Sequence, residues 1–231
     1  MFKYVCGKNS ILDAIENHLV FKVIYISRKS DIRFFANQKI ELVTTEFLNS
    51  LTKANHQGFV GILENAKFFP LDVIAKDNPK TVLILDHLQD QQNLGAILRT
   101  ANAAGLKHII LPKDRAASIS EVTLKISSGG FVGLKFIVVS SLSATITTLK
   151  KQGFWIYASA LDEKSNSIYD WNPNLPAAII VGNESKGISK TLLNQADELI
   201  YIPMQGTVQS LNVSVATGII LFNFNNRIKE K

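Results

Sequence analysis

The 231-residue sequence is poor in the residue types that mark several classes of protein. Its single cysteine, Cys6, excludes an internal disulfide and fits a reducing compartment. Four scattered histidines beside that cysteine give no cluster with the spacing of metal ligands, so no metal site is expected. No apolar run reaches the ~18 residues that span a bilayer, and residues 1–10 resemble neither a signal peptide nor a transit peptide. A cytoplasmic protein without a membrane partner is predicted.

Two nucleotide-binding motifs are also absent. Residues 182–187 have the glycine spacing of a phosphate-binding loop, but Ile188 stands where that loop needs a lysine. No G-x-G-x-x-G sequence follows residues 81–85, the first strand expected in the second half of the chain. Hydrolysis of nucleoside triphosphates and an ordinary dinucleotide-binding fold are therefore not expected.

The composition is that of a folded protein with a mild excess of positive charge. Apolar residues make up 46% of the chain, enough for the core of one large domain or two small ones. The chain has 25 Lys and Arg against 19 Asp and Glu, a net charge of +6, which favours a polyanionic partner. No basic block and no aromatic RNA-binding sequence is present, so composition by itself does not name RNA.

Residues 1–64 predict a small α/β domain, and residues 65–80 predict a linker. Runs rich in β-branched residues indicate strands, while Ser10 and Thr45 are expected to cap helices. The elements expected in this domain are strands at 23–26, 40–43 and 59–63 and helices at 11–17 and 46–54. After residue 64 the periodicity fades, and turn-forming residues such as Pro70 and Pro79 appear.

Residues 81–231 predict an open α/β domain with a parallel sheet. Its strands are continuous apolar runs, as is typical of parallel strands covered on both faces. They alternate with helical stretches, which is the pattern of an open α/β sheet. The expected strands are 81–85, 108–111, 136–139, 155–159, 178–181 and 199–202, and the expected helices are 94–104, 120–128, 142–152, 189–195 and 213–228.

The most informative stretch is residues 202–216, where a strand ends and a helix begins. Pro203 and Gly206 interrupt regular structure, and either Ser210 or Asn212 can cap the helix that follows. Several polar side chains therefore gather at one open edge of the sheet. Taken alone, the stretch also fits an ordinary capped helix of an α/β protein.

Three blocks, residues 93–101, 181–188 and 202–216, resemble in this order the three motifs of the SpoU family of RNA ribose 2′-O-methyltransferases. The resemblance implies S-adenosyl-L-methionine as cofactor, a deep trefoil knot in the methyltransferase domain and a homodimer. Residues 202–221 are especially similar to family members that methylate guanosine in large-subunit ribosomal RNA, which makes this RNA the preferred substrate. Transfer RNA is the alternative within the family, and DNA is not expected as a partner.

The N-terminal domain resembles, more loosely, the RNA substrate-binding domain of the same family. The resemblance rests on residues 6–10 and on the run His56-Gln57-Gly58. It implies a fold like that of a ribosomal RNA-binding protein. For His56, a turn residue with a solvated ring fits the sequence at least as well as an RNA contact.

The resemblance also implies which residues bind the cofactor. Gly182, Ile202 and Leu211 are expected to contact S-adenosylmethionine, with Met204 and Gly206 as neighbours. Backbone groups at strand ends would hold most of the cofactor, so apolar side chains can serve as contacts. From the residues alone, Ile202 and Leu211 would be assigned to the core.

Arg99 is expected to be the main catalytic cation. It lies on a mostly apolar helix, where a lone arginine either snorkels to the surface or faces a phosphate. The resemblance favours the second role and implies a general base. Because a guanidinium keeps its proton, our hypothesis is that Arg99 clamps an RNA phosphate and stabilises the forming alkoxide.

Four polar residues complete the expected site. Glu184 would accept hydrogen bonds from loop amides or Asn93, although a surface acid in a turn is an alternative for it. Ser210 and Asn212 would orient the ribose and the arginine. This intact set argues against the alternative from another class, a ribosome-assembly or RNA-binding protein that has lost catalysis.

The chain departs from the family pattern at two positions. Gln91 stands where proline is frequent, and Ser185 stands where glycine is frequent. Both changes are expected to alter loop stiffness while every polar catalytic position stays filled.

Overall fold

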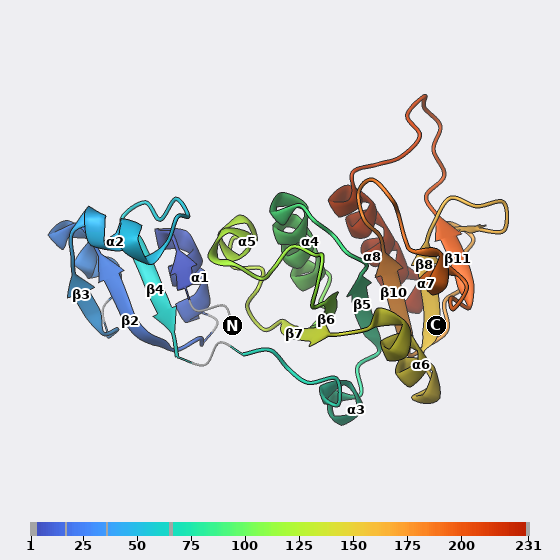
Figure 1. Ribbon diagram of the computed structural model, residues 1–231, viewed down its shortest axis with the longest axis horizontal. Coiled ribbons are helices and arrows are strands. Elements are labelled where there is room, and N and C mark those ends of the chain that lie inside the picture. The colour runs from blue at the N-terminus through green and yellow to red at the C-terminus, as the bar shows by residue number, and fades with distance from the viewer. Residues whose placement is uncertain (1–3, 17, 36, 65–66, 230–231) are drawn as a thin grey trace. The chain divides into compact units, whose positions relative to one another are not determined.

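The computed structural model describes residues 4–16, 18–35, 37–64 and 67–229. The chain forms two compact units. Unit 1 comprises Met1–Lys67 and Ser118–Gly133, and unit 2 comprises Phe68–Ala117 and Leu134–Lys231. Each has a sheet of its own (Figure 1).

Unit 1 is built on a four-stranded sheet in the order β1-β4-β2-β3. Strand β4 is antiparallel to both β1 and β2, whereas β2 and β3 are parallel. The strands are β1 (Tyr4–Cys6), β2 (Phe21–Ile26), β3 (Ile40–Leu42) and β4 (Phe59–Leu63). The helices are α1 (Lys8–Glu16), the 3₁₀ helix η1 (Lys29–Phe35), α2 (Thr45–Leu51) and α5 (Glu121–Ile126).

Both predicted helix caps in unit 1 are wrong. Helix α1 begins before Ser10, which is buried inside the helix. Helix α2 begins at Thr45 because its neighbour Thr44 has an extended backbone, and the Thr44 hydroxyl accepts the N–H of Phe47 at 3.2 Å. The strand predicted at 59–63 is confirmed, while the two other predicted strands, 23–26 and 40–43, differ from β2 and β3 at one end.

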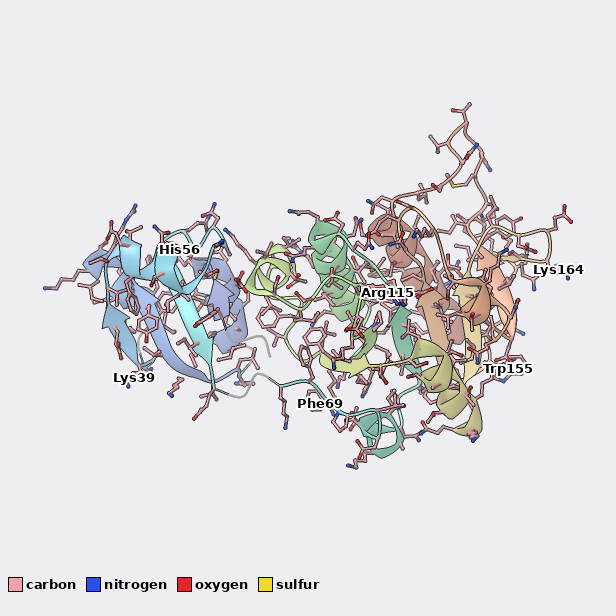
Figure 2. All side chains as sticks on the ribbon, viewed as in Figure 1. Lys39, His56, Phe69, Arg115, Trp155 and Lys164 are labelled. Carbon is pink, nitrogen blue, oxygen red and sulfur yellow. The ribbon has the colours of Figure 1, made fainter. Side chains whose placement is uncertain are left out.

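His56, labelled in Figure 2, has a ring that is buried in unit 1. The interpretation of His56 as a turn residue with a solvated ring is therefore wrong. The Nδ1 atom accepts the backbone N–H of Gly58 at 3.0 Å. The Nε2 atom therefore carries the proton and donates to Oδ1 of Asn49 at 2.9 Å. Burial lowers the pKa of His56 below its ordinary value, and the positive charge of Lys125 acts in the same direction.

Unit 2 is an α/β structure with a seven-stranded sheet in the order β7-β6-β5-β10-β8-β11-β9. All of its strand pairs are parallel, which confirms the predicted parallel α/β architecture. The strands are β5 (Thr81–Leu85), β6 (His108–Pro112), β7 (Lys135–Val139), β8 (Trp155–Ser159), β9 (Asn166–Ser167), β10 (Ala177–Val181) and β11 (Glu198–Tyr201). The helices are α3 (Val73–Asp77), α4 (Gln91–Ala103), α6 (Leu142–Lys151), α7 (Lys190–Leu193) and α8 (Val213–Lys229).

The two faces of this sheet are covered by different helices. Helices α3, α6 and α7 form one apolar cluster with every second strand residue, for example Ile84. The alternate strand residues, such as Leu83, face the opposite side, where α4 and α8 pack against each other. A Cβ atom at Gly218 of α8 would lie 3.3 Å from a methyl group of Thr100, so the small residue permits this close helix contact.

The segment predicted as a linker contains structure. Helix α3 lies within it, and the N–H of Phe69 donates to the carbonyl of Phe136 at 2.8 Å, which ties the segment to β7 (Figure 2). The domain boundaries 1–64, 65–80 and 81–231 stay a prediction. Among the described residues, no helix combines the length and the apolar character needed to cross a membrane.

Candidate active site

A cavity of about 660 Å³ opens at the carboxyl ends of β8, β10 and β11. Strands β5 and β10 are neighbours in the sheet, yet the chain continues from β5 to β6 on one side and from β10 to β11 on the other. Ligands of open α/β sheets bind at such a change of direction, outside the carboxyl ends of the strands. Four of the five residues predicted to bind the cofactor line this cavity, namely Gly182, Ile202, Met204 and Leu211.

The fifth predicted cofactor residue, Gly206, does not line the cavity within the part of the chain that the structure describes. The segment between β11 and α8 extends far beyond the edge of the sheet before it returns (Figure 1). Gly206 lies in this exposed segment, and no atom would lie within 4 Å of a Cβ added to it. Nearness in sequence to Ile202 therefore does not bring Gly206 to the cavity.

Gly182 is required at its position by a close approach of the backbone. A Cβ atom there would overlap the backbone of Gly187 and Ile188. The approach exists because the loop folds back on itself: Asn183 N–H donates to the carbonyl of Gly187 at 3.0 Å, and Gly187 N–H donates to that of Asn183 at 2.9 Å. Gly187 has a φ of 67°, a left-handed conformation that favours glycine.

The side chain of Asn183 stabilises the same loop and was not singled out from the sequence. Its Oδ1 atom accepts the N–H groups of Ser185 at 3.0 Å and Lys186 at 3.1 Å, while its Nδ2 atom donates to the carbonyl of His87 at 2.8 Å. Ser185 is not among the residues with positive φ, so serine fits the position where the family frequently has glycine.

Asn93, Glu184 and Asn212, one from each predicted motif, form a continuous chain of hydrogen bonds. Asn93 Nδ2 donates to Oε1 of Glu184 at 3.1 Å, and Asn212 Nδ2 donates to Oδ1 of Asn93 at 2.9 Å. The Glu184 carboxylate also accepts the backbone N–H groups of Asp90 at 3.4 Å and Gln89 at 3.5 Å. Glu184 is thus held by the chain just before α4 and by the first turn of that helix.

Asn212 also caps helix α8. Its Oδ1 atom accepts the N–H of Ser214 at 2.8 Å and the Ser214 hydroxyl at 2.6 Å. Of the two caps that the sequence left open, Asn212 and not Ser210 makes this bond. With both bonds on Oδ1, the Nδ2 atom of Asn212 is oriented toward Asn93.

Two further predicted catalytic residues stand apart from this chain of bonds. Ser210 lines the cavity with an exposed side chain. Arg99 is exposed on α4 and does not line the cavity, and it makes no hydrogen bond or ion pair with the part of the chain that the structure describes. Arg99 follows Asn93 by six positions in the helix, so the two side chains leave α4 on different sides. Arg99 is therefore open to an external anion.

Asp86 and Asp90 are two acids that the sequence reasoning did not single out. Asp86 is buried at the end of β5, where its carboxylate contacts Nδ1 of His87 at 2.5 Å and accepts the N–H of Ser189 at 2.7 Å. Asp90 caps α4 by accepting the N–H of Gln92 at 2.9 Å. Gln91 then occupies the first helical position, where proline is favoured but not required. An acid directly after a buried strand was the available signal for Asp86.

Comparison with known proteins identifies the family. Residues 80–222 match the SpoU rRNA Methylase family. The chain belongs to this family. Residues 4–69 match the family described as RNA 2′-O ribose methyltransferase substrate binding. The family predicted from the three motifs is thereby confirmed, together with its class of enzyme, the RNA 2′-O-methyltransferases.

Individual relatives cover most of the chain. The uncharacterized tRNA/rRNA methyltransferase MG252 of Mycoplasma genitalium is 38% identical over 231 residues, which span 95% of this chain and 96% of that protein. The 23S rRNA (guanosine-2′-O-)-methyltransferase RlmB of Coxiella burnetii is 39% identical over 189 residues, 80% of this chain and 75% of that protein. The AdoMet-bound rRNA methyltransferase from Sinorhizobium meliloti superposes with a TM-score of 0.81 at 26% identity, covering 98% of this chain and 87% of that chain. S-adenosylmethionine is therefore confirmed as a cofactor of the family.

Proposed function

We propose that the protein transfers a methyl group from S-adenosylmethionine to the 2′-hydroxyl of a ribose in large-subunit ribosomal RNA, with guanosine as the preferred nucleotide. The observation that carries the proposal is the hydrogen-bonded chain of Glu184, Asn93 and Asn212 beside the cavity. The relatives that methylate guanosine in 23S ribosomal RNA support the choice of substrate.

The lining of the cavity fits S-adenosylmethionine. The absence of a Cβ atom at Gly182 lets the backbone of Gly187 and Ile188 pack closely beside the cavity, and Ile202, Met204 and Leu211 would supply apolar contacts for a nucleoside. Backbone groups at the strand ends supply hydrogen bonds without charge. When bound, the cofactor supplies an electrophilic methyl group on a sulfonium.

The residues of the chain would position and stabilise the reacting ribose. Bonds between Asn93, Glu184 and Asn212 fix these polar groups before the substrate arrives, so they need little reorganisation during the reaction. Arg99 would bind the adjoining phosphate and stabilise the oxygen as its proton leaves. Since a guanidinium keeps its proton, this role fits Arg99 better than that of a base.

Unit 1 would bind the RNA. The substrate-binding family matches this part of the chain. Two cations also make cation–π contacts with one aromatic ring of this unit. Nζ of Lys8 lies 3.1 Å from the ring centre of Phe34, and the guanidinium carbon of Arg33 lies 5.0 Å from it. The trefoil knot and the homodimer stay predictions that follow from the family, and the cytoplasmic location stays a prediction that follows from the composition.

The test is methyl transfer from labelled S-adenosylmethionine to separated ribosomal and transfer RNA pools, with Arg99→Ala as the control. Label in large-subunit RNA that disappears in the variant supports the proposal. Label confined to transfer RNA keeps the chemistry and replaces the substrate. RNA binding without label in any pool favours the non-catalytic assembly protein.

A further inference from the structure

The wall of the cavity carries two charged side chains among the residues described, Glu184 and Lys186. The Glu184 carboxylate is engaged by the Asn93 side chain and by two backbone N–H groups. Lys186 is exposed, and its ammonium group has no hydrogen bond or ion pair with the described part of the chain. The cavity therefore presents one cation that makes no ion pair with the described part of the chain.

The backbone of Lys186 is held in place although its side chain is exposed. Its N–H group donates to Oδ1 of Asn183 at 3.1 Å, and the loop closes through the paired backbone bonds of Asn183 and Gly187. A lysine on a fixed loop can reach a ligand at the mouth of the cavity with its flexible side chain. The loop is the one that also carries Glu184, so Lys186 follows the polar site by two residues.

The two ligands of the proposed reaction differ in charge. S-adenosylmethionine has a sulfonium, an ammonium and one carboxylate, and is a net cation at neutral pH. RNA carries one negative charge for each nucleotide. An unpaired ammonium is repelled by the net positive charge of S-adenosylmethionine and attracted by the phosphates of RNA. Lysine binds phosphate as a point charge and needs no fixed geometry.

We propose that Lys186 binds a backbone phosphate of the RNA strand that enters the cavity, and that it sets the affinity for RNA and not the affinity for the cofactor. The proposal rests on the proposed function. It adds a second phosphate contact to the one proposed for Arg99. Arg99 belongs to the first motif, residues 93–101, and Lys186 belongs to the second, residues 181–188.

The test compares Lys186→Gln with Lys190→Gln in the full chain. Lys190 is the matched control, since it is exposed, lies four residues further on and does not line the cavity. Binding of large-subunit RNA is measured at several salt concentrations, and the Kd for S-adenosylmethionine is measured by calorimetry without RNA. Lys186→Gln should weaken RNA binding roughly three- to tenfold at ~0.1 M salt and lower the slope of log K against log salt by about 0.7–0.9. The Kd for S-adenosylmethionine should be unchanged, and Lys190→Gln should match the wild type in both.

Two outcomes would overturn the proposal. A weaker Kd for S-adenosylmethionine with an unchanged salt slope would assign Lys186 to the cofactor carboxylate. Equal behaviour of the two variants would leave Lys186 without a ligand. If the wild type methylates no RNA but Lys186→Gln still lowers the salt slope, the proposed function fails while the phosphate contact stands. Circular dichroism of both variants checks that the fold is retained.

Discussion

The side-chain amide of Asn212 donates to Oδ1 of Asn93 at 2.9 Å, across 119 positions of the sequence. The bond joins the start of α8 to the first turn of α4, two helices that pack against each other. Because Asn93 donates onward to Glu184, the three motifs of the family meet in one polar chain. The packing of α4 on α8 thus determines the geometry of the site.

Loss of the amide at Asn93 should reduce catalysis more than stability. Asn93→Asp keeps the shape but replaces the donor that faces Glu184 with a second carboxylate, which repels it. We expect kcat to fall ~10²-fold, in the range seen when a preorganised polar group is removed. Methyl transfer at saturating RNA and cofactor measures this. Gln92→Ala, an exposed neighbour on α4, serves as control and should keep wild-type activity; similar rates for both variants would contradict the role of Asn93.

The charge of Arg99 should matter more than its shape. Arg99→Ala is expected to lose ~10²–10³ in rate, as for loss of an oxyanion-stabilising donor, while Arg99→Lys retains part of the activity through its point charge. Single-turnover rates at saturating RNA measure the chemical step for both variants. Equal loss in the two would argue that the planar guanidinium, and not its charge alone, is needed.

The architecture was accessible from the sequence because buried parallel strands are continuous apolar runs. Strands 81–85 and 155–159 match the prediction at both ends. Strand β9 was missed since its two residues, Asn166 and Ser167, form no apolar run. The cap of α2 was misplaced by one residue because Thr44 and Thr45 are chemically equal, and only backbone angles distinguish them.

The site was less accessible, because its contacts join distant parts of the chain. The bond from Asn93 to Glu184 spans 91 positions, and no local pattern predicts it. Only the resemblance to the family brought these residues together. The role of Gly206 stays a prediction, since this residue is near the cofactor motif in sequence but does not line the cavity among the described residues. No sequence pattern indicates the role of Asn183, because its side chain forms hydrogen bonds with backbone groups that only the folded loop brings near it.

Gly182 and Gly206 should respond in opposite ways to alanine. In Gly182→Ala the new Cβ atom would overlap the backbone of Gly187 and Ile188, so the loop of residues 182–187 beside the cavity must move. We expect the Kd for S-adenosylmethionine to rise at least ~10-fold, by analogy with other forced overlaps in packed sites. Gly206→Ala has open space around it and should keep the wild-type Kd. Calorimetry measures the Kd for S-adenosylmethionine in both variants. A loss of affinity in Gly206→Ala would show that Gly206 belongs to the cofactor site.

The buried ring of His56 should make the stability of unit 1 depend on pH. Burial disfavours the imidazolium and lowers the pKa of His56 from 6.5, and Lys125 adds to this effect. The neutral ring accepts the N–H of Gly58, so protonation would also break that bond. The contribution of neutral His56 to stability is complete above pH 6.5, and it declines as the pH falls from there toward the lowered pKa.

The expected result is a larger loss of Tm between pH 7.5 and pH 5.5 in the wild type than in His56→Gln, whose side chain has no charge to gain. Hydrogen exchange of amides in β4, read at both pH values, assigns the loss to unit 1. His18→Gln is the control, because it makes the same substitution at an exposed histidine. A pH dependence of Tm that is identical in the wild type and His56→Gln would show that other groups control the acid stability of this unit.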